Sequence, residues 1–193
     1  MLMHTLLKFK DAEPWAEIFL TLPSDQITIW RQLCQDYNFD VKHTVVNGGA
    51  TRFGSVQNAL KLLPATKGLV AVHDGVRPLV SVKVIQESFK AAAQHGSAIT
   101  AVPVKDSVRQ ITESGSQNIN RDLLRLVQTP QTFKLELLCE AFEKATHNQF
   151  TDDASVAEAA GHKIHLITGQ YSNIKITTPE DMLLAEALLR NEG

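Results

Sequence analysis

The stretch that decides the fold is residues 68–78, which read Gly-Leu-Val-Ala-Val-His-Asp-Gly-Val-Arg-Pro. Its apolar run, Leu69–Val72, has no polar face, which is typical of a parallel strand covered by helices on both sides. The run stops at His73, so the carboxylate of Asp74 is expected at the carboxyl end of the strand, where open α/β sheets bind ligands. Asp-Gly is also a common turn pair, but the next segment reads as a helix and not as a returning strand. We therefore interpret Asp74 as a functional residue.

Strand-like and helix-like segments alternate on both sides of this stretch. Their order predicts an α/β fold with a doubly wound, mostly parallel, Rossmann-like sheet. At 193 residues the chain is expected to form a single domain, residues 1–193. The expected strands are 15–22, 41–46, 68–73, 98–104, 124–133, 162–168 and 173–177, and the expected helices are 1–9, 26–37, 54–63, 81–95, 134–145, 151–161 and 179–189.

A polar segment at about residues 105–124 interrupts this order. It reads as two short strands, 107–112 and 117–121, joined by a Glu-Ser-Gly-Ser turn. The segment has too few large apolar residues to pack well by itself, and isolated two-stranded ribbons are marginally stable in water. We therefore expect a β-arm that reaches onto a second copy of the chain, which predicts a homodimer.

The composition excludes several classes of protein. Hydrophobic residues make up 44% and charged residues 21%, and the formal net charge of -2 argues against a protein that binds nucleic acid or a membrane surface. No apolar run is long enough to span a bilayer, and the first residues do not resemble a signal peptide. Cys34 and Cys139 have no metal-ligand spacing and read as reduced thiols. A cytoplasmic protein is expected.

Two loops at strand ends carry candidate ligand-binding residues. Residues 48–56 (GGATRFGSV) end a strand and open a helix, and their glycines and helix N-terminal amides suit an anion. The stretch matches neither common phosphate-loop pattern and is equally typical of an ordinary turn. In the second loop, Asp74 is suited to hold Mg²⁺. Arg77 would either orient a phosphate or form an internal ion pair, and both interpretations stay open.

Three other polar residues have ordinary structural explanations. Thr151 precedes two acids, and together they suit the start of a helix; because the acids would repel a phosphate, any anion contact would come from Thr151 itself. Lys175 lies mid-strand, on the face opposite two isoleucines, and reads as a solvated edge residue. Arg121, near the base of the arm, would either bind phosphate or keep the ribbon soluble.

Six short motifs follow one another along the chain. They are G-G-x-x-R-x-x-S-V (48–56), V-H-D-x-x-R-P (72–78), V-P-V-K-D (102–106), T-P-Q-x-F (129–133), T-D-D-A-S (151–155) and N-I-K-I-T-x-P-E-D (173–181). Together they resemble the 2-C-methyl-D-erythritol 4-phosphate cytidylyltransferase family of the non-mevalonate isoprenoid pathway, in the family's order and with similar spacing. Any one motif is weak, but six in order over essentially the whole chain are highly specific.

The resemblance implies a reaction and a role for each candidate residue. A phosphate oxygen of the sugar-alcohol phosphate would attack the α-phosphorus of CTP, and pyrophosphate would leave, by positioning and charge neutralisation. Asp74, serving the Mg²⁺-bound triphosphate, and Lys175, near the α-phosphate, are the implied catalytic residues. The implied nucleotide contacts are Gly49, Ala50, Ser55, Asp74 and Lys175. The implied substrate contacts are Arg77, Arg121 and Thr151, the last two meeting across the dimer through the exchanged arm.

One part of the family pattern has no counterpart here. Members of the family begin with a strand and a Gly-rich loop, G-x-G-x-R-x-G, followed by a P-K-Q segment. The resemblance starts at the next helix, so a strand–helix unit of about 30 residues is expected to be missing, and neighbouring strands unpaired. An impaired enzyme is therefore expected. A late start assignment, a fragment and a non-catalytic nucleotide-binding dimer are all open, as is another polyol phosphate substrate such as ribitol 5-phosphate.

Overall fold

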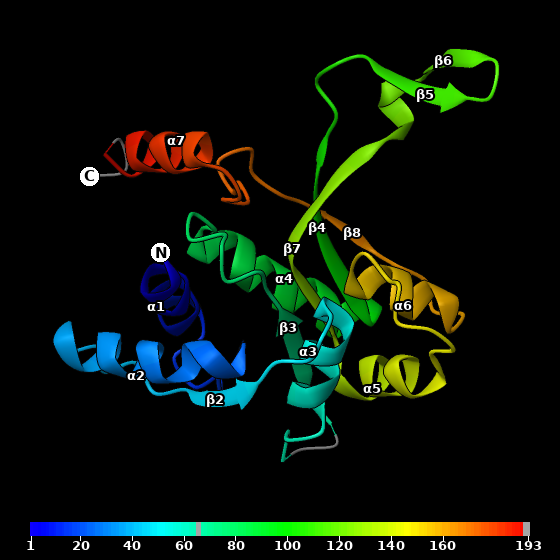
Figure 1. The fold of residues 1–193 in the computed structure, drawn as a ribbon. Coiled ribbons are helices and arrows are strands. Elements are labelled where there is room, and N and C mark those ends of the chain that lie inside the picture. The colour runs from blue at the N-terminus through cyan, green and yellow to red at the C-terminus, as the bar shows by residue number, and fades with distance from the viewer. Residues whose placement is uncertain (65–66, 191–193) are drawn as a thin grey trace.

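The computed structural model describes residues 1–64 and 67–190. Its main sheet has four strands in the order β3-β7-β4-β8 and lies at the centre of the molecule (Figure 1). These strands are β3 (Leu69–Val72), β7 (Arg125–Lys134), β4 (Ser97–Pro103) and β8 (Leu166–Thr168). The expected α/β fold is therefore observed, and β3 ends two residues before Asp74. The prediction that this strand is parallel is wrong, because β3 lies at the edge of the sheet and pairs antiparallel with β7.

Helices cover both faces of the main sheet. Thr132 on β7 donates a hydrogen bond to Ser88 on α4 (Val82–His95), whereas Phe133, the next residue, is buried in an apolar cluster with the other helices. Those helices are α3 (Arg52–Leu60), α5 (Leu135–Lys144) and α6 (Asp153–Ala159). Successive residues of a strand point to opposite faces, so α4 covers one face and these three helices cover the other. This double cover explains why residues 97–102 of β4 are all buried.

A second, smaller sheet lies beside the main one. β1 and β2 pair in parallel and make no ladder with the main sheet within residues 1–64 and 67–190. The elements of this unit are α1 (Leu2–Ala12), β1 (Phe19–Leu22), η1 (Ser24–Gln26), α2 (Ile27–Asp36) and β2 (Thr44–Asn47). Its core is Leu6, Leu20, Trp30 and Val41. Within the described chain, β1 and β3 each keep one edge unpaired.

The main sheet is mixed, and the prediction of a mostly parallel sheet does not describe it. β7 runs antiparallel to both of its neighbours, β3 and β4, and only β4 and β8 pair in parallel. The reason is the connection: the chain leaves β4 through the arm and returns directly, without the helical crossover that parallel neighbours require. β7 therefore enters the sheet between two strands that precede it in sequence.

Three predicted strands differ from the structure because a strand exists only where a neighbour supplies hydrogen bonds. Segment 15–22 pairs only over Phe19–Leu22, opposite the four residues of β2, and Trp15 lies in a turn. Segment 162–168 pairs only over Leu166–Thr168. Segment 173–177 is not a strand; a single backbone hydrogen bond, from Ile176 N to Val76 O at 2.9 Å, ties it to the loop after β3.

The last helix, α7 (Pro179–Arg190), begins where the sequence indicates. Thr178 Oγ1 accepts a hydrogen bond from the backbone N–H of Asp181, and the Asp181 carboxylate accepts one from the backbone N–H of Thr178. This reciprocal pairing satisfies amide groups that a helix start leaves without partners. It confirms the expected cap and fixes the direction in which the chain leaves segment 173–177.

The arm projects from the body as a separate hairpin (Figure 1). It contains β5 (Val108–Thr112) and β6 (Gly115–Ile119), an antiparallel pair, and the short helix η2 (Arg121–Leu123). Ile111 and Leu123 leave 80% and 81% of their surface exposed. The predicted ribbon is thus observed, with apolar side chains that nothing in the described chain covers, whereas its contact with a second copy stays a prediction.

Two further sequence expectations concern the chain as a whole. None of the helices within residues 1–64 and 67–190 has the length and apolar character needed to cross a bilayer. Cys34 and Cys139 are both free thiols, as expected from their spacing.

Candidate active site

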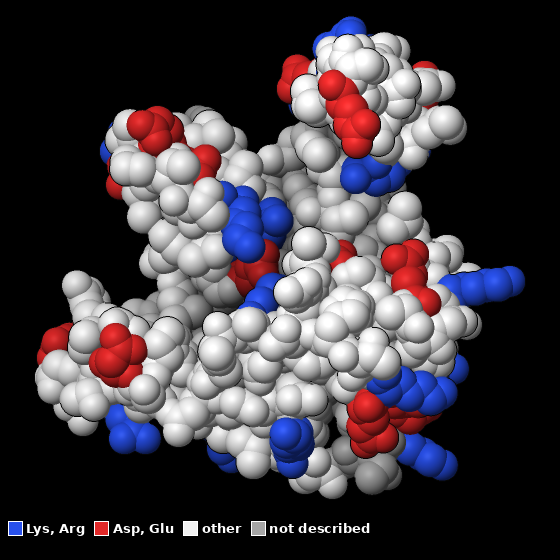
Figure 2. All heavy atoms as spheres, turned by 45° about the vertical axis from the view of Figure 1, so that its right-hand side comes forward, with Lys and Arg blue, Asp and Glu red and all other residues white. Residues whose placement is uncertain are grey.

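Three cationic side chains surround the carboxylate of Asp74. Lys175 Nζ lies 3.2 Å and Arg77 Nε 3.3 Å from Asp74 Oδ2, while Arg52 Nε lies 3.6 Å from Oδ1. We call these four residues the Asp74 cluster. Figure 2 shows basic and acidic side chains meeting in a hollow in the middle of the molecule's face. The sequence analysis singled out Asp74, Arg77 and Lys175 separately, and the structure brings them together.

Each member of the cluster comes from a different part of the chain. Asp74 lies two residues after the end of β3, and Arg77 ends the short turn after it, where the Arg77 backbone N–H donates to the Asp74 carbonyl. Arg52 is the first residue of α3, whose N-cap is Thr51. Lys175 lies between Ile174, which packs on a core cluster, and the buried Ile176. Those two apolar contacts hold segment 173–177 against the body and direct Lys175 toward the cluster.

The electrostatics of the cluster keep Asp74 ionised. Burial alone would raise the pKa of the Asp74 carboxyl, but the combined attraction of Lys175, Arg52 and Arg77 outweighs burial and holds that pKa below its usual value. The Asp74 side chain retains 14% of its exposure and Lys175 45%. The cluster is therefore accessible to a ligand, and it carries more cationic groups than this one carboxylate balances.

A buried ion pair anchors Arg52. Arg52 Nη2 donates to Asp153 Oδ2 at 2.6 Å, and the Asp153 side chain is only 1% exposed. Burial raises the pKa of Asp153, and Arg52 opposes that rise without cancelling it. The pKa of Arg52 is raised despite burial, because Asp153 and Asp74 both favour its charged form. The second oxygen of Asp153, Oδ1, is buried and has no hydrogen-bond partner in the described chain.

Asp152 and Asp153 have different roles, although both lie at the start of α6. Asp152 is the N-cap and accepts the backbone N–H of Ser155 at 3.0 Å, as expected for an acid at a helix start. Asp153 points the other way, toward Arg52. Gln131 on β7 holds the turn by donating to Asp152 and accepting from the N–H groups of Asp153 and Ala154. Capping alone therefore does not explain the second acid.

A chain of hydrogen bonds that begins at Thr129 of β7 fixes the backbone of Asp74. The Asp74 N–H donates to Thr129 Oγ1 at 3.1 Å, and Thr129 Oγ1 lies 3.0 Å from His73 Nδ1. His73 Nε2 lies 3.1 Å from the carbonyl oxygen of Arg77. Burial lowers the pKa of His73 to about 4, so the ring is neutral near pH 7. With Nε2–H donating to Arg77, Nδ1 accepts from the Thr129 hydroxyl, and the bonds are mutually consistent.

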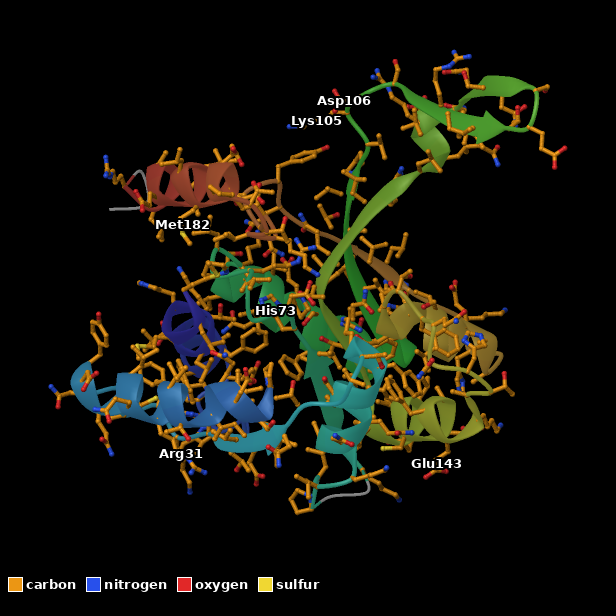
Figure 3. The ribbon with its side chains drawn as sticks, viewed as in Figure 1. Arg31, His73, Lys105, Asp106, Glu143 and Met182 are labelled. Atoms are coloured by element: carbon orange, nitrogen blue, oxygen red, sulfur yellow. The ribbon has the colours of Figure 1, made fainter. Side chains whose placement is uncertain are left out.

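His73 lies inside the molecule, close to β3, whereas Lys105 and Asp106 lie at the base of the arm (Figure 3). The His73 ring contacts the ring of Phe9 in α1, and the two ring centroids are 4.9 Å apart. Asn173 extends the same support toward Lys175: its Nδ2 donates to the Thr129 carbonyl, and its own carbonyl accepts from Arg77 Nη1, both at 2.8 Å. The turn that carries Asp74 and the segment that carries Lys175 are thus joined to β7.

The loop that contains Gly48 and Gly49 lies at the amino end of α3. We call it the glycine-rich loop below; it is distinct from the Gly-rich loop at the start of the family pattern. The Gly49 N–H donates to Ser55 Oγ at 3.0 Å, and a side chain at Gly49 would lie 2.5 Å from a backbone carbon of Gly54, so only glycine fits there. Ala50 is exposed next to this turn. Gly49 and Ser55, which the sequence predicts as nucleotide contacts, are therefore adjacent in space, and Ala50 extends the same loop.

Arg121 and Thr151 do not join the Asp74 cluster in one copy of the chain. Arg121 lies on the arm and donates to the Lys105 carbonyl. Thr151 is exposed, directly before the cap of α6. Neither residue forms a hydrogen bond or ion pair with Asp74, Arg77 or Lys175 in the described chain. Their predicted meeting across a dimer is not tested by a single copy.

Sequence reasoning missed Arg52, Asp153, His73 and Thr129 as parts of the site. The available signal was motif context: Arg52 is the arginine of G-G-x-x-R, and His73 and Thr129 lie in V-H-D-x-x-R-P and T-P-Q-x-F. Within the described residues, no group of three or more His, Cys, Asp or Glu side chains is arranged to hold a metal. Chemically, the arrangement suits an anion with several phosphates, and Asp74, the carboxylate of the cluster, is partly exposed and could also contact a cation.

Comparison with known proteins gives a consistent result. Residues 1–191 match the family described as IspD, 2-C-methyl-D-erythritol 4-phosphate cytidylyltransferase. The chain is 47% identical over 189 residues to the 2-C-methyl-D-erythritol 4-phosphate cytidylyltransferase of Bacteroides thetaiotaomicron, covering 98% of this chain and 86% of the relative. The protein of the same name from Porphyromonas gingivalis is 45% identical over 190 residues, covering 98% of this chain and 84% of its own length.

Solved structures agree with this result. The 4-diphosphocytidyl-2C-methyl-D-erythritol synthase of Anaerococcus prevotii superposes with a TM-score of 0.88 at 34% identity, covering 98% of this chain and 85% of the solved one. The 2-C-methyl-D-erythritol 4-phosphate cytidylyltransferase of Thermus thermophilus gives a TM-score of 0.82, also at 34% identity, covering 97% of this chain and 87% of its own.

Proposed function

The chain belongs to the 2-C-methyl-D-erythritol 4-phosphate cytidylyltransferase family, and from this premise we propose that it transfers CMP from CTP to 2-C-methyl-D-erythritol 4-phosphate. The products would be 4-diphosphocytidyl-2-C-methyl-D-erythritol and pyrophosphate. The observation that carries the proposal is the Asp74 cluster, in which Arg52, Arg77 and Lys175 lie within 3.6 Å of one ionised carboxylate. Such a cluster suits a reaction whose catalysis is mostly positioning and charge neutralisation.

We assign a Mg²⁺ ion to Asp74. Mg²⁺ in phosphoryl-transfer enzymes is usually held by one or two carboxylates together with substrate phosphates and water. Asp74 fits this requirement because it is ionised, partly exposed and next to cations that would bind the same phosphates. The ion would neutralise charge on the triphosphate. Asp74 itself would hold the ion and keep Lys175 and Arg77 aligned when no nucleotide is bound.

The cationic side chains divide the remaining tasks between them. Lys175, the most exposed of the three, would bind the α-phosphate and stabilise the negative charge that increases there as the acceptor oxygen attacks. Arg77, held by Asn173 O, would orient the phosphate of the acceptor. Arg52, locked to the buried Asp153, would act as a fixed positive charge behind the site. The family resemblance suggests the role of Lys175, and the exposure and anchoring of each side chain support this division.

The nucleoside end would lie over the glycine-rich loop. Gly49 leaves its backbone uncovered, and Ser55 fixes the turn by accepting the Gly49 N–H. Ala50 would contact the base or the sugar. This loop adjoins Arg52, the first residue of α3, so a nucleotide placed there can extend its phosphates toward Asp74.

We infer that the complete acceptor site needs two copies of the chain. Arg121 lies on the projecting arm and Thr151 on the body. An arm that reaches onto a second copy would bring Arg121 of one chain to Thr151 of the other. The exposed Ile111 and Leu123 supply apolar surface for that contact.

The experiment is an assay of pyrophosphate release by this chain with CTP, 2-C-methyl-D-erythritol 4-phosphate and Mg²⁺. Because the sequence predicts an impaired enzyme, the proposal expects slow release that disappears in Asp74→Asn and persists in Asp36→Asn, a matched change at an exposed carboxylate. Ribitol 5-phosphate, added as a competing acceptor, should not reduce the yield of the expected product. No release, or release that is unchanged in Asp74→Asn, would overturn the proposal for this chain.

A further inference from the structure

The base of the arm contacts the loop that leads to Lys175. Tyr171 lies in this loop, between β8 and segment 173–177. Its hydroxyl donates to the carbonyl oxygen of Pro103 at 2.9 Å, and Lys105 Nζ lies 3.5 Å from the centroid of its ring. Pro103 is the last residue of β4, and Lys105 lies at the base of the arm (Figure 3). One side chain therefore links the arm to the segment that carries Lys175.

The two contacts fix the Tyr171 side chain through its ring and through its hydroxyl. An ammonium group this close to the centroid of an aromatic ring is attracted by the negative face of the ring. The hydrogen bond to Pro103 sets the direction in which the ring points. Because Tyr171 leaves 44% of its surface exposed, burial contributes less to its position than it does for a core residue. The contacts with Lys105 and Pro103 therefore decide where the ring lies.

The loop before Tyr171 is attached tightly to the main sheet. The Gly169 N–H donates to the Ala101 carbonyl of β4 at 2.8 Å, and a side chain at Gly169 would lie 2.5 Å from Gln128 Oε1. Gln128 Nε2, on β7, donates to the carbonyl oxygen of Gln170 at 2.8 Å. The chain thus reaches Tyr171 from a fixed point on β4 and β7, and Tyr171 extends this attachment to the arm.

The chain between Tyr171 and Lys175 is short and contains a closed turn. The Asn173 N–H donates to the Gln170 carbonyl at 3.0 Å, so Tyr171 is the second residue of a turn. The carbonyl of Asn173 also accepts from Arg77 Nη1. A displacement of Tyr171 would therefore move the backbone of Lys175 together with the group that holds Arg77.

We propose that Tyr171 is a positioning residue that sets the place of Lys175 relative to the base of the arm. This rests on the proposed function, in which Lys175 acts on the α-phosphate and the arm reaches onto a second copy. Arg121, the arm residue expected to contact the acceptor, donates to the Lys105 carbonyl. Arg121 is thus connected to Lys175 through Lys105 and Tyr171. Docking of the arm on a second copy would then act on Lys175 of the chain that supplies the arm.

Steady-state kinetics of pyrophosphate release separate positioning from binding. Tyr171→Leu removes both contacts and should lower kcat about tenfold while KM for CTP changes less than about twofold, because small displacements of a group that acts in the transition state are costly. Tyr171→Phe keeps the ring beside Lys105 and should recover part of the loss. Tyr37→Leu, at an exposed tyrosine after α2, is the matched control and should leave kcat unchanged. An unchanged kcat in Tyr171→Leu, or a change in KM alone, would overturn the proposal.

Hydrogen exchange tests the same link without enzymatic activity. Tyr171→Leu and Lys105→Met should each speed exchange in segment 173–177 about threefold or more and leave β3 and α5 unchanged. Lys105 lies on the arm side of the link, so its effect on that segment must pass through Tyr171. Lys83→Met, in the exposed ion pair on α4, should leave exchange in the segment unchanged.

The two measurements distinguish failure of this proposal from failure of the proposed function. Unchanged exchange in both variants, or faster exchange in β3 and α5 as well, would overturn the role of Tyr171. If the unsubstituted chain releases no pyrophosphate but the exchange result is as expected, the link between the arm and segment 173–177 stands and only the proposed function fails.

Discussion

The side chains of the Asp74 cluster and those of Arg121 and Thr151 differ in how firmly the rest of the chain holds them. Asp74 is fixed through its backbone by Thr129, and its cationic neighbours are fixed by Asp153 and Asn173. Arg121 and Thr151 are exposed and have no such support from buried side chains. The Asp74 cluster is thus formed within a single chain, whereas the part of the site that we propose for Arg121 and Thr151 would depend on a second copy.

The largest effect is expected at Lys175. Lys175→Met should lower kcat about 100-fold or more while KM for CTP changes less, because the lysine is proposed to act on charge that increases in the transition state. Steady-state kinetics of pyrophosphate release measure both values. Lys175→Arg is the matched control and should retain part of the rate. A variant that changes KM alone would move Lys175 from catalysis to binding.

The next effect is on stability. Arg52→Met should destabilise the fold by roughly 3 kcal/mol, because it leaves Asp153 buried and unpaired. The folded-state pKa of Asp153 is already raised by burial, so the folded protein binds a proton there at a higher pH than the unfolded chain does. Lowering the pH should therefore reduce the destabilisation, as measured by urea unfolding at several pH values. Lys83→Met, in an exposed ion pair, should change stability by less than about 0.5 kcal/mol.

His73 should make the stability of the fold depend on pH in the acid range. Its folded-state pKa of about 4 lies below the usual histidine value, so the unfolded chain binds a proton that the folded chain does not accept. The stabilisation is present at neutral pH and is lost as the pH falls from 6.5 to about 4, with a size of roughly 3 kcal/mol. Urea unfolding of His73→Gln should lack this component. The exposed His4→Gln should keep it, and an identical profile for His73→Gln would exclude this role.

The smallest effect on the stability of the fold is expected at the two exposed residues, Arg121 and Thr151. Arg121→Ala and Thr151→Ala should each change stability by less than about 0.5 kcal/mol while raising KM for the acceptor phosphate. An equal mixture of the two variants, unfolded and refolded together, tests the exchanged arm. Random pairing makes half of the dimers mixed, and each mixed dimer has one intact site, so about one quarter of the activity should return. No recovery would place both residues in the same copy.

The sequence predicted the cluster's centre because its signal is local. An unbroken apolar run that stops at His-Asp-Gly predicts a strand that ends there, and β3 does end directly before His73, although it is a partly exposed edge strand that pairs antiparallel and not the covered parallel strand that the run suggested. Lys175 had no such signal. From its residues alone it reads as solvated, and only the family resemblance indicated a role, because the contact with Asp74 depends on how segment 173–177 packs.

Arg52 and Asp153 were missed for a physical reason. The two residues are 101 positions apart in the chain, and each has a sufficient local explanation at the start of its helix. The direction of β7 was missed for a similar reason. Its residues show that it is buried, but burial is the same for a strand that pairs parallel or antiparallel, and the position between β3 and β4 is a property of the whole sheet.

The insertion of β7 also has a consequence for how the chain is made. On the ribosome, β3 emerges first, then β4, and β7, which separates them, emerges last. β7, which ends at Lys134, is complete 62 residues after β3 ends at Val72. At a synthesis rate of about 5–20 residues per second, β3 remains without its neighbour β7 for roughly 3–12 s. During that interval the nascent chain exposes an apolar strand, and a chaperone that holds it would protect the future site from aggregation.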